Sequence, residues 1–522
     1  MSGAATRLGI AVVVFDASEG PLVHRLDGTI TLSADERTAL STAALPDSEG
    51  RDGALGTQLL TFHFEGRDIW CFSLYRAVRD PDVPRGVSQS ALVLLAEHPL
   101  LDEYRAAVAH MADAPHRWRD TPCPHVESAT PRSVWRAGCC LGLDDLCPRC
   151  CRFLANADES VAAWMLQSEF SEPSGRSTLP SPLDGAFNGL TVRVRPAYAQ
   201  LLAAGLGASC WRLWQLLLCG ETLRVFAPSA QHASETAIAL TCLLAPLPFA
   251  ASQLRPHVTV HHAHADAIVE DGAWPHTAAR GGGGGGVVFS VANHYFLKGK
   301  PPPRLATLHL GEAPATTGSA GAPASPEGAG EGAGNGAAGA ACSAACSAAG
   351  SAAGGAAGGA AGRAATPQLH AGGIEPLVRP DAYVLRQLEA AREQRAGGTS
   401  STRGEGGGDV RASSLLLQHH FGSLTASFLS PLERFGAMGS LRLAPPPATR
   451  GAGEPLALLE RFDAERFLDE VCRLQPQPLP KTIVPGKAEL RSLYERFLGT
   501  EHFRLWWEAR RERAVAESLG ST

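Results

Sequence analysis

Residues 211–249, WRLWQLLLCGETLRVFAPSAQHASETAIALTCLLAPLPF, decide the fold of this chain. The stretch opens on a segment that is apolar on nearly every side, from Trp211 to Leu218, and a helix without a polar face is usually buried. We therefore predict a buried helix over residues 208–219. Gly220 follows it at the position where a left-handed residue commonly ends a helix.

The second half of the stretch repeats the change from strand to helix. Residues 223–227 (LRVFA) form a short, mostly apolar segment typical of a strand in a sheet covered on both faces, and Pro228 ends it. Ser229 is a suitable N-cap for a helix whose apolar residues share one face, namely Ala233, Ala237, Leu240 and Leu244. Val258–Val260 is the next strand candidate. Helix, strand, helix and strand in this order predict an α/β layer around a mostly parallel sheet.

Composition narrows the class of protein. The chain has 522 residues, 44% of them hydrophobic, which allows two or three domains with a large core. Its net charge of −6 gives no basic excess for nucleic-acid binding. Neither a signal peptide nor an apolar run long enough for a transmembrane helix is recognisable. Thirteen cysteines, an odd number without a secretory signal, indicate reduced thiols in a soluble cytoplasmic protein.

The chain divides into five segments. Residues 1–112 alternate strands and helices in the order ββα, three strands and a helix at 101–112, which resembles a longin-like module. Residues 113–180 are rich in Cys, Pro and Arg, and residues 181–310 carry the α/β pattern described above. Residues 311–375 consist almost entirely of Gly, Ala, Ser and Pro, which predicts a disordered insert. Residues 376–522 are helical, with helices expected at 380–395, 413–438, 463–473, 487–498 and 501–516.

In this order the segments resemble a DENN-domain protein, most closely the DENN domain-containing protein 6 (FAM116-type) group. The resemblance is collinear along most of the chain, and no single motif is diagnostic. Its stretches are Leu45–Ser48, Leu55–Gln58 and Tyr75–Asp80 upstream; Gly220-Glu221, Val225–Ser229, Arg255-Pro256 and Val291–Asn293 in the centre; Pro431–Glu433 and Tyr494–Phe497 downstream. The Cys-rich segment and the Gly/Ala-rich insert depart from the family pattern.

The resemblance implies guanine nucleotide exchange on a Rab-type small GTPase in endosomal or vesicle traffic. Such an exchanger breaks no covalent bond and needs no cofactor, because it acts by binding the nucleotide-free GTPase more tightly than the loaded one. The resemblance also implies that the binding site is a surface between the two α/β modules. It further implies that the protein is recruited from the cytoplasm to endosomal membranes. A scaffold with the same fold that binds a Rab or an effector without opening its nucleotide site remains an alternative.

Five charged residues are candidate GTPase contacts. Arg79, Asp80 and Arg85 gather near a strand end of the first module, where charge clusters are also typical of solvated turns. Glu221 precedes the first strand of the second module and Glu235 lies in the helix expected after it, near the region where open α/β sheets present binding groups. For each of these residues, a GTPase contact and a purely structural role both stay open.

Two clusters could hold a metal. Cys147 and Cys150 have the CxxC spacing of zinc ligands, and Cys123 with His125 could complete a tetrahedral set. The alternative is a loop with exposed thiols. His257 and His261 fall on one face of a strand, although that segment also reads simply as a strand and its exit loop.

Overall fold

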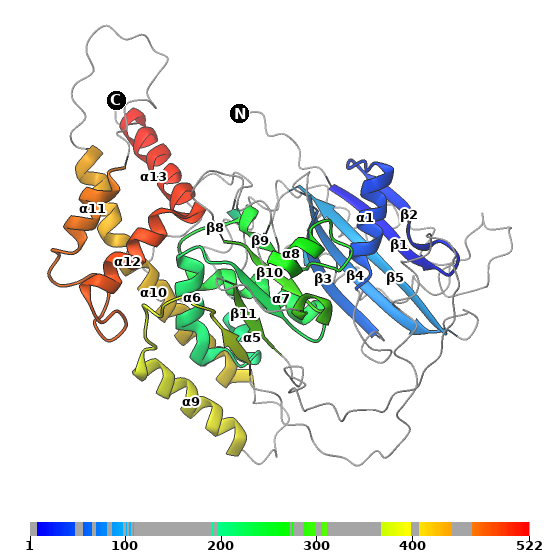
Figure 1. Cartoon of the computed structure of the whole chain (residues 1–522), viewed down its shortest axis with the longest axis horizontal. Coiled ribbons are helices and arrows are strands. Elements are labelled where there is room, and N and C mark those ends of the chain that lie inside the picture. Colours follow the sequence, from blue (N-terminus) through cyan, green and yellow to red (C-terminus); the bar gives the residue numbers. More distant parts are fainter. Residues whose placement is uncertain are drawn as a thin grey trace, which may run out of the picture. The chain divides into compact units, whose positions relative to one another are not determined.

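The computed structural model describes residues 8–46, 56–64, 69–80, 86–97, 101, 104, 105, 108, 191–192, 197–271, 274, 286–298, 305–310, 367–397, 407–440 and 462–520. All of them belong to one compact unit. Figure 1 shows its two sheets and the helices that follow them along the chain. The fold is mixed α/β with helices downstream, as the sequence predicts.

The first sheet is antiparallel throughout. Its strands are β1 (Leu8–Asp16), β2 (Gly20–Gly28), β3 (Gly56–Phe64), β4 (Ile69–Arg79) and β5 (Val87–Ala96), in the order β2-β1-β5-β4-β3. Helix α1 (Ala34–Ala44) begins at a capping box, in which Ser33 accepts from the Glu36 amide and Glu36 accepts from the Ser33 amide. The three central strands are apolar on both sides, so both faces of this sheet need a cover.

Two helical segments supply that cover. On one face, Ala11, Val13 and Val93 pack with Leu40 of α1. On the other face, Ile10, Phe72 and Leu94 pack with Leu101, Tyr104 and Val108, whose spacing of three and four residues fits one helical face. The Phe72 and Tyr104 rings lie 5.4 Å apart. These residues agree with the helix predicted over 101–112.

A short helix and a glycine turn lead into the second sheet. Helix α5 (Tyr198–Ala203) precedes α6 (Cys210–Leu218), on which every residue except Arg212 is buried. Gly220 ends α6 at φ 62°, in the left-handed region. The Glu221 amide donates to Leu216 O at 2.9 Å and the Gly220 amide to Leu217 O at 3.1 Å, which is the hydrogen-bond pattern of a Schellman motif. The predicted helix and its glycine stop are confirmed.

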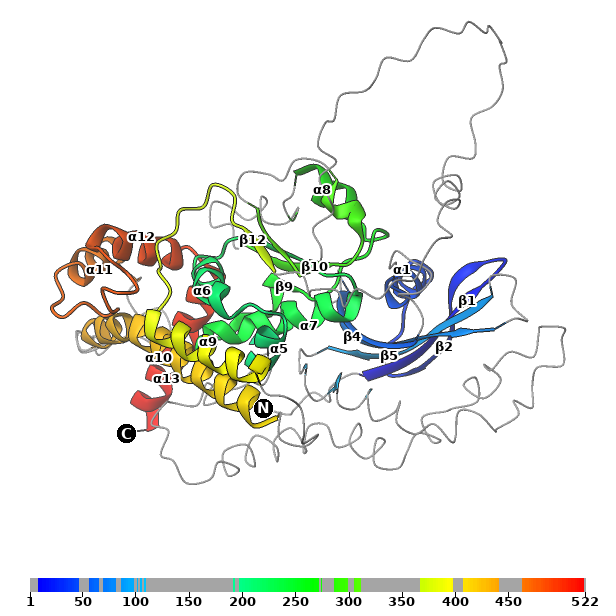
Figure 2. The same ribbon diagram turned by 90° about the horizontal axis from the view of Figure 1, so that it is seen from below.

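The second sheet has the strand order β12-β11-β7-β10-β9. Strands β7 (Leu223–Phe226), β9 (Leu254–Arg255), β10 (Val288–Val291) and β11 (Ala306–His309) pair in parallel, and β12 (Gln368–His370) is antiparallel to β11. Helices α6 and α7 (Ala230–Thr241) pack on the face that carries Leu223 and Val225. Helix α8 (Ala265–Asp271) and the 3-10 turn η8 (His294–Leu297) pack on the face that carries Phe226 and Phe289, opposite α7 in Figure 2.

One strand prediction is wrong. Residues 258–260 are not a strand; the strand in this region is the two-residue β9, which ends at Arg255. The next residue, Pro256, has no amide hydrogen for a sheet hydrogen bond, so the ladder stops there. Val258 still donates to Ser290 O at 2.8 Å, which keeps its segment beside β10. A third sheet has only two strands, β6 (Thr191–Val192) and β8 (Phe249–Ala250).

The downstream part consists of α9 (Ala382–Gly397), α10 (Gly407–Ser440), α11 (Ala464–Val471), α12 (Lys487–Leu498) and α13 (Glu501–Gly520). The five predicted helices are confirmed, although α10 starts earlier than expected. Two tryptophans of α6 donate their indole N–H groups to α10: Trp211 to His420 and Trp214 to Thr425, each at 3.0 Å. The Phe428 ring stacks on Tyr494 of α12 at 4.2 Å, which extends the same core into the last helices.

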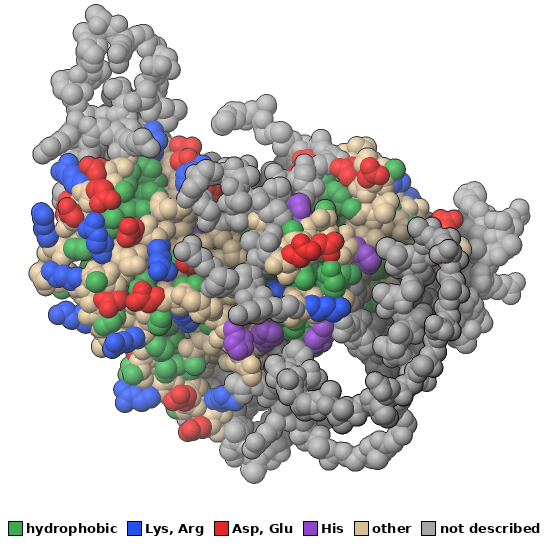
Figure 3. Space-filling model, in the orientation of Figure 1, with side chains coloured by type: hydrophobic (Ala, Val, Ile, Leu, Met, Phe, Trp, Pro, Cys, Tyr) green, Lys and Arg blue, Asp and Glu red, His purple; other side chains and the backbone are tan. Residues whose placement is uncertain are grey.

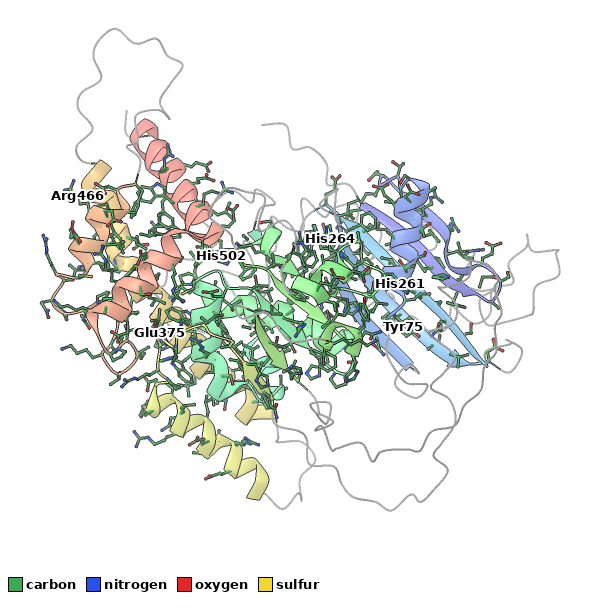
Figure 4. All side chains as sticks on the ribbon, in the orientation of Figure 1. Tyr75, His261, His264, Glu375, Arg466 and His502 are labelled. Carbon is green, nitrogen blue, oxygen red and sulfur yellow. The ribbon has the colours of Figure 1, made fainter. Side chains whose placement is uncertain are left out.

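Two buried polar side chains join these helices to the sheets. Gln215 of α6 accepts from the Leu377 amide at 2.9 Å and donates to Glu375 O at 2.8 Å. His502, at the start of α13, accepts from the Ala250 amide of β8 at 3.2 Å. Figure 4 labels Glu375 and His502 in these two positions. None of the helices within the described ranges has the length and apolar composition of a membrane-spanning helix.

Candidate functional site

The junction between the two sheets is the region to which the sequence assigns GTPase binding. Helix α7 begins there, because Ser229 accepts from the His232 amide at 3.2 Å as its N-cap. Ala230 and Ala292 pack into the core under the first sheet. Their small side chains allow the backbones of the second module to approach the first closely. Figure 1 shows α7 beside β3.

Polar contacts fix this junction. The Leu59 amide of β3 donates to Gln231 Oε1 of α7 at 3.1 Å. Gln231 Nε2 donates in turn to Glu235 Oε1 at 2.9 Å, and Arg105 Nη2 donates to the same carboxylate at 2.8 Å. The Arg105 and Glu235 side chains are 18% and 28% exposed, so water screens this ion pair only in part. The network links β3, residue 105 and α7, which come from three distant parts of the chain.

Glu235 is therefore the central acceptor of an internal network. Of the five candidate contacts, it is the one that lies at the junction, where it accepts from Arg105 and Gln231. A GTPase could engage it only by sharing or displacing Arg105. Its role as a GTPase contact stays a prediction, and the structure adds a role in joining the modules.

Glu221 lies elsewhere, directly after the Gly220 turn. Its carboxylate is 3.4 Å from Arg496 Nη1 of α12, and the two side chains are 21% and 33% exposed. This pair ties the amino end of β7 to the downstream helices. The structure thus does not bring Glu221 and Glu235 together, because they stand on opposite sides of β7 along the chain.

The remaining candidates surround the connection between β4 and β5. Arg79 is the last residue of β4, and Asp80, 7% exposed, follows it. The Asp80 amide donates to Gly86 O at 3.0 Å, and Gly86 has φ 68°, so these two residues close the connection. The Arg79 side chain and the whole of Arg85 lie outside the described residues. The burial of Asp80 favours a local role for that carboxylate over a surface contact.

The proposed zinc ligands Cys123, His125, Cys147 and Cys150 also lie outside the described residues. The histidine cluster near β9 lies within them. His257 is buried, and the rings of His262 and His264 lie 5.2 and 5.9 Å from Trp274. Over the described ranges, no three His, Cys, Asp or Glu side chains are grouped as metal ligands. His262 and His264 instead border an aromatic cluster.

Sequence reasoning missed several polar residues. Gln231 and Arg105 carry the junction, and nothing in their local sequence separates them from solvated helix residues. Arg224, His309 and His370 gather on one face of the second sheet. The sequence did contain a signal for Arg224, since an arginine inside a buried strand requires a partner.

Comparison with known proteins finds several DENND6 proteins that are similar to this chain. Human protein DENND6B is 24% identical over 540 residues, an alignment that covers 96% of this chain and 78% of that protein. Mouse DENND6A is 25% identical over 302 residues, covering 58% of this chain and 40% of its own length. Mouse DENND6B is 37% identical over 86 residues, which are 16% of this chain.

Along nearly its whole length the chain is similar to DENND6-type DENN-domain proteins. No family model matches the sequence. The alignment with human DENND6B covers 96% of the chain, so the similarity extends over nearly all of the described fold. The resemblance in the sequence is confirmed.

Proposed function

We propose that this chain is a guanine nucleotide exchange factor for a Rab-type small GTPase in endosomal or vesicle traffic. The observation that carries the proposal is similarity to human DENND6B over 96% of the chain, since DENN domains typically act as Rab exchange factors. On this proposal the first sheet with α1 is the longin-like module, and the parallel sheet with α6–α8 is the central DENN module.

Exchange requires binding energy and no bond-making residue. The factor accelerates release only as far as it binds the nucleotide-free GTPase more tightly than the nucleotide-bound one. That preference requires a surface that keeps its shape while the switch regions of the GTPase move. The Leu59–Gln231–Glu235–Arg105 network supports this requirement, because it holds the two modules in a fixed relation at their junction.

The candidate contacts fall into two groups. Glu221 and Glu235 have internal partners, so we propose that they shape the surface and contact the GTPase at most at its edge. Arg79 is the last residue of β4, and Asp80 and Arg85 follow it; we propose the two arginines as the first contacts to test. The double charge reversal Arg79→Glu with Arg85→Glu tests this pair. His24→Gln on the exposed side of β2 is a matched control.

The second candidate is a scaffold that holds a Rab without opening its nucleotide site. Binding to one Rab in three states separates the two functions. An exchange factor binds the nucleotide-free state at least tenfold more tightly than the GDP- or GTP-loaded state, whereas a scaffold binds the GTP-loaded state as tightly or more tightly. Equal or weaker binding to the nucleotide-free state would reject the exchange proposal and leave the scaffold.

We also propose peripheral recruitment to endosomal membranes, where a Rab substrate would reside. Flotation of the purified chain with vesicles that carry a prenylated Rab tests this point. Recruitment should require the Rab, and flotation with vesicles lacking it would point to direct lipid binding instead.

A further inference from the structure

A cluster of one arginine and several histidines lies on one face of the second sheet, under the turn η8. The register of the parallel strands places Arg224 of β7 beside Thr307 of β11, and β12 places His370 beside Thr307. One step along the strands, Phe226 is beside His309. Because side chains two residues apart share a face, Arg224, Phe226, Thr307, His309 and His370 all project from the same side of the sheet.

Arg224 forms the floor of this cluster. It is 6% exposed, donates through Nη1 to Phe296 O of η8, and donates through Nη2 to Thr307 Oγ1 at 3.3 Å. Its Nε is buried and has no hydrogen-bond partner in the described part of the chain. Burial lowers the pKa of Arg224 to about 10, so the guanidinium remains charged at neutral pH. A buried cation with one unmatched donor is a costly arrangement unless an anion completes it.

Histidines form the rim. The His309 ring lies 5.7 Å from the His370 ring and 5.7 Å from Phe226, and the His294 ring of η8 lies 4.9 Å from Phe226. His309 Nδ1 is also buried and without a partner among the residues described. Burial first, and then the charges of His370, Arg224 and His294, lower the pKa of His309 to about 4. The charged groups that act on this imidazole are therefore all positive.

The position on the fold agrees with the chemistry. His309 and Phe226 are the last residues of two neighbouring parallel strands, and open α/β sheets bind ligands outside the carboxyl ends of such strands. His370 is exposed and His309 partly exposed, so a ligand can reach the rim from solvent. Figure 3 shows histidine side chains gathered at the surface over this central part of the chain.

We propose that Arg224, His309 and His370 bind a phosphate group. Guanidinium and imidazole groups donate to phosphate oxygens, and a phosphate with up to two negative charges matches three positive or protonatable side chains. A metal ion fits poorly, because Arg224 would repel it. The site does not depend on the exchange function, since none of its residues is among the candidate GTPase contacts.

Two sources of the phosphate group are chemically equivalent here, free inorganic phosphate and the headgroup of a phosphoinositide lipid. Titration of the full chain with inorganic phosphate, at constant ionic strength maintained with chloride, measures the first. Titration with soluble inositol 1,4,5-trisphosphate measures the second, and vesicles of phosphatidylcholine with and without phosphoinositide show whether the headgroup binds when it is in a membrane.

The test follows histidine side-chain resonances by NMR, with His309→Gln and His370→Gln assigning the two signals. Both signals should shift saturably with phosphate or the headgroup, and each substitution should weaken binding about tenfold, the loss expected for one charge-assisted hydrogen bond. His24→Gln, on the first sheet, should leave binding unchanged. These variants spare Arg224, whose loss could unfold the sheet.

Absence of saturable shifts with every phosphate compound would overturn the proposal. Binding of equal affinity in the wild type and both rim variants would overturn it too, because the phosphate would then sit elsewhere. In that case Arg224 serves only to tie η8 to the sheet. Stronger binding of the headgroup than of inorganic phosphate would support the site and identify a lipid as its source.

Discussion

Replacing Gly220 with alanine should destabilise the connection between α6 and β7 for two separable reasons. Gly220 has φ +62°, where an L-residue costs about 1–2 kcal/mol. An added Cβ would also lie 2.9 Å from Thr500 Cγ2, a contact that must shift, and overpacking of this kind costs about 1–3 kcal/mol. The free energy of unfolding should therefore fall by about 2–5 kcal/mol.

The second substitution separates the two causes. Thr500 donates to Phe497 O at 2.7 Å and accepts from the Phe503 amide at 3.1 Å through Oγ1. Thr500→Ser keeps this oxygen and removes the methyl group that meets the new Cβ. Gly220→Ala should then cost less in the Thr500→Ser background, by about 1 kcal/mol or more, because only the backbone cost remains.

Urea unfolding followed by tryptophan fluorescence measures the free energy of unfolding of the wild type, the two single variants and the double variant. Trp211 and Trp214 on α6 lie close to the substitution. No loss of stability in Gly220→Ala would refute the left-handed turn itself. Additive effects, with a coupling below about 0.3–0.5 kcal/mol, would refute the contact between residue 220 and Thr500.

Two further predictions concern the junction and a buried histidine. A double-mutant cycle with Arg105→Met and Glu235→Gln should give a coupling free energy of about 1 kcal/mol for this partly screened pair. In Gln231→Leu, hydrogen exchange at the Leu59 amide should accelerate, because that amide loses its acceptor. Zero coupling together with unchanged exchange would show that the network does not join the modules. Burial lowers the pKa of His502 to about 4 in the folded chain, whereas an unfolded histidine has a pKa of about 6.5. The folded state then binds fewer protons, so its stability is fully present above pH ~6.5 and declines as pH falls toward about 4, by roughly 2–4 kcal/mol. In His502→Gln, whose amide oxygen can still accept from Ala250, stability measured by urea unfolding should lose this part of its pH dependence, and an unchanged slope would contradict the assignment.

Hydrophobic periodicity was sufficient to locate most elements, for a physical reason. Helix α6 and strand β7 are mostly apolar, and Gly220 and Ser229 end and begin their helices through local backbone geometry that depends on neighbouring residues alone. The prediction failed at β9, whose two residues are too few to show a period and whose end is set by Pro256.

The site was less predictable, because it depends on pairing across the sequence. Arg105 and Glu235 are 130 residues apart, and only the folded chain brings them together. Glu235 was selected as a charged residue near a strand; the structure places it in α7, and its internal partner could not be foreseen. The cluster of Arg224, His309 and His370 depends in the same way on the register of β7, β11 and β12.

The central claim is that this DENND6-type chain opens the nucleotide site of a Rab. Release of fluorescent GDP from each member of a Rab panel, with the full chain in catalytic amount and excess unlabelled nucleotide, tests it most directly. The account predicts that release from at least one endosomal Rab accelerates in proportion to the concentration of the chain, and that Arg79→Glu with Arg85→Glu slows it while His24→Gln does not. Release at the intrinsic rate from every Rab in the panel would contradict it.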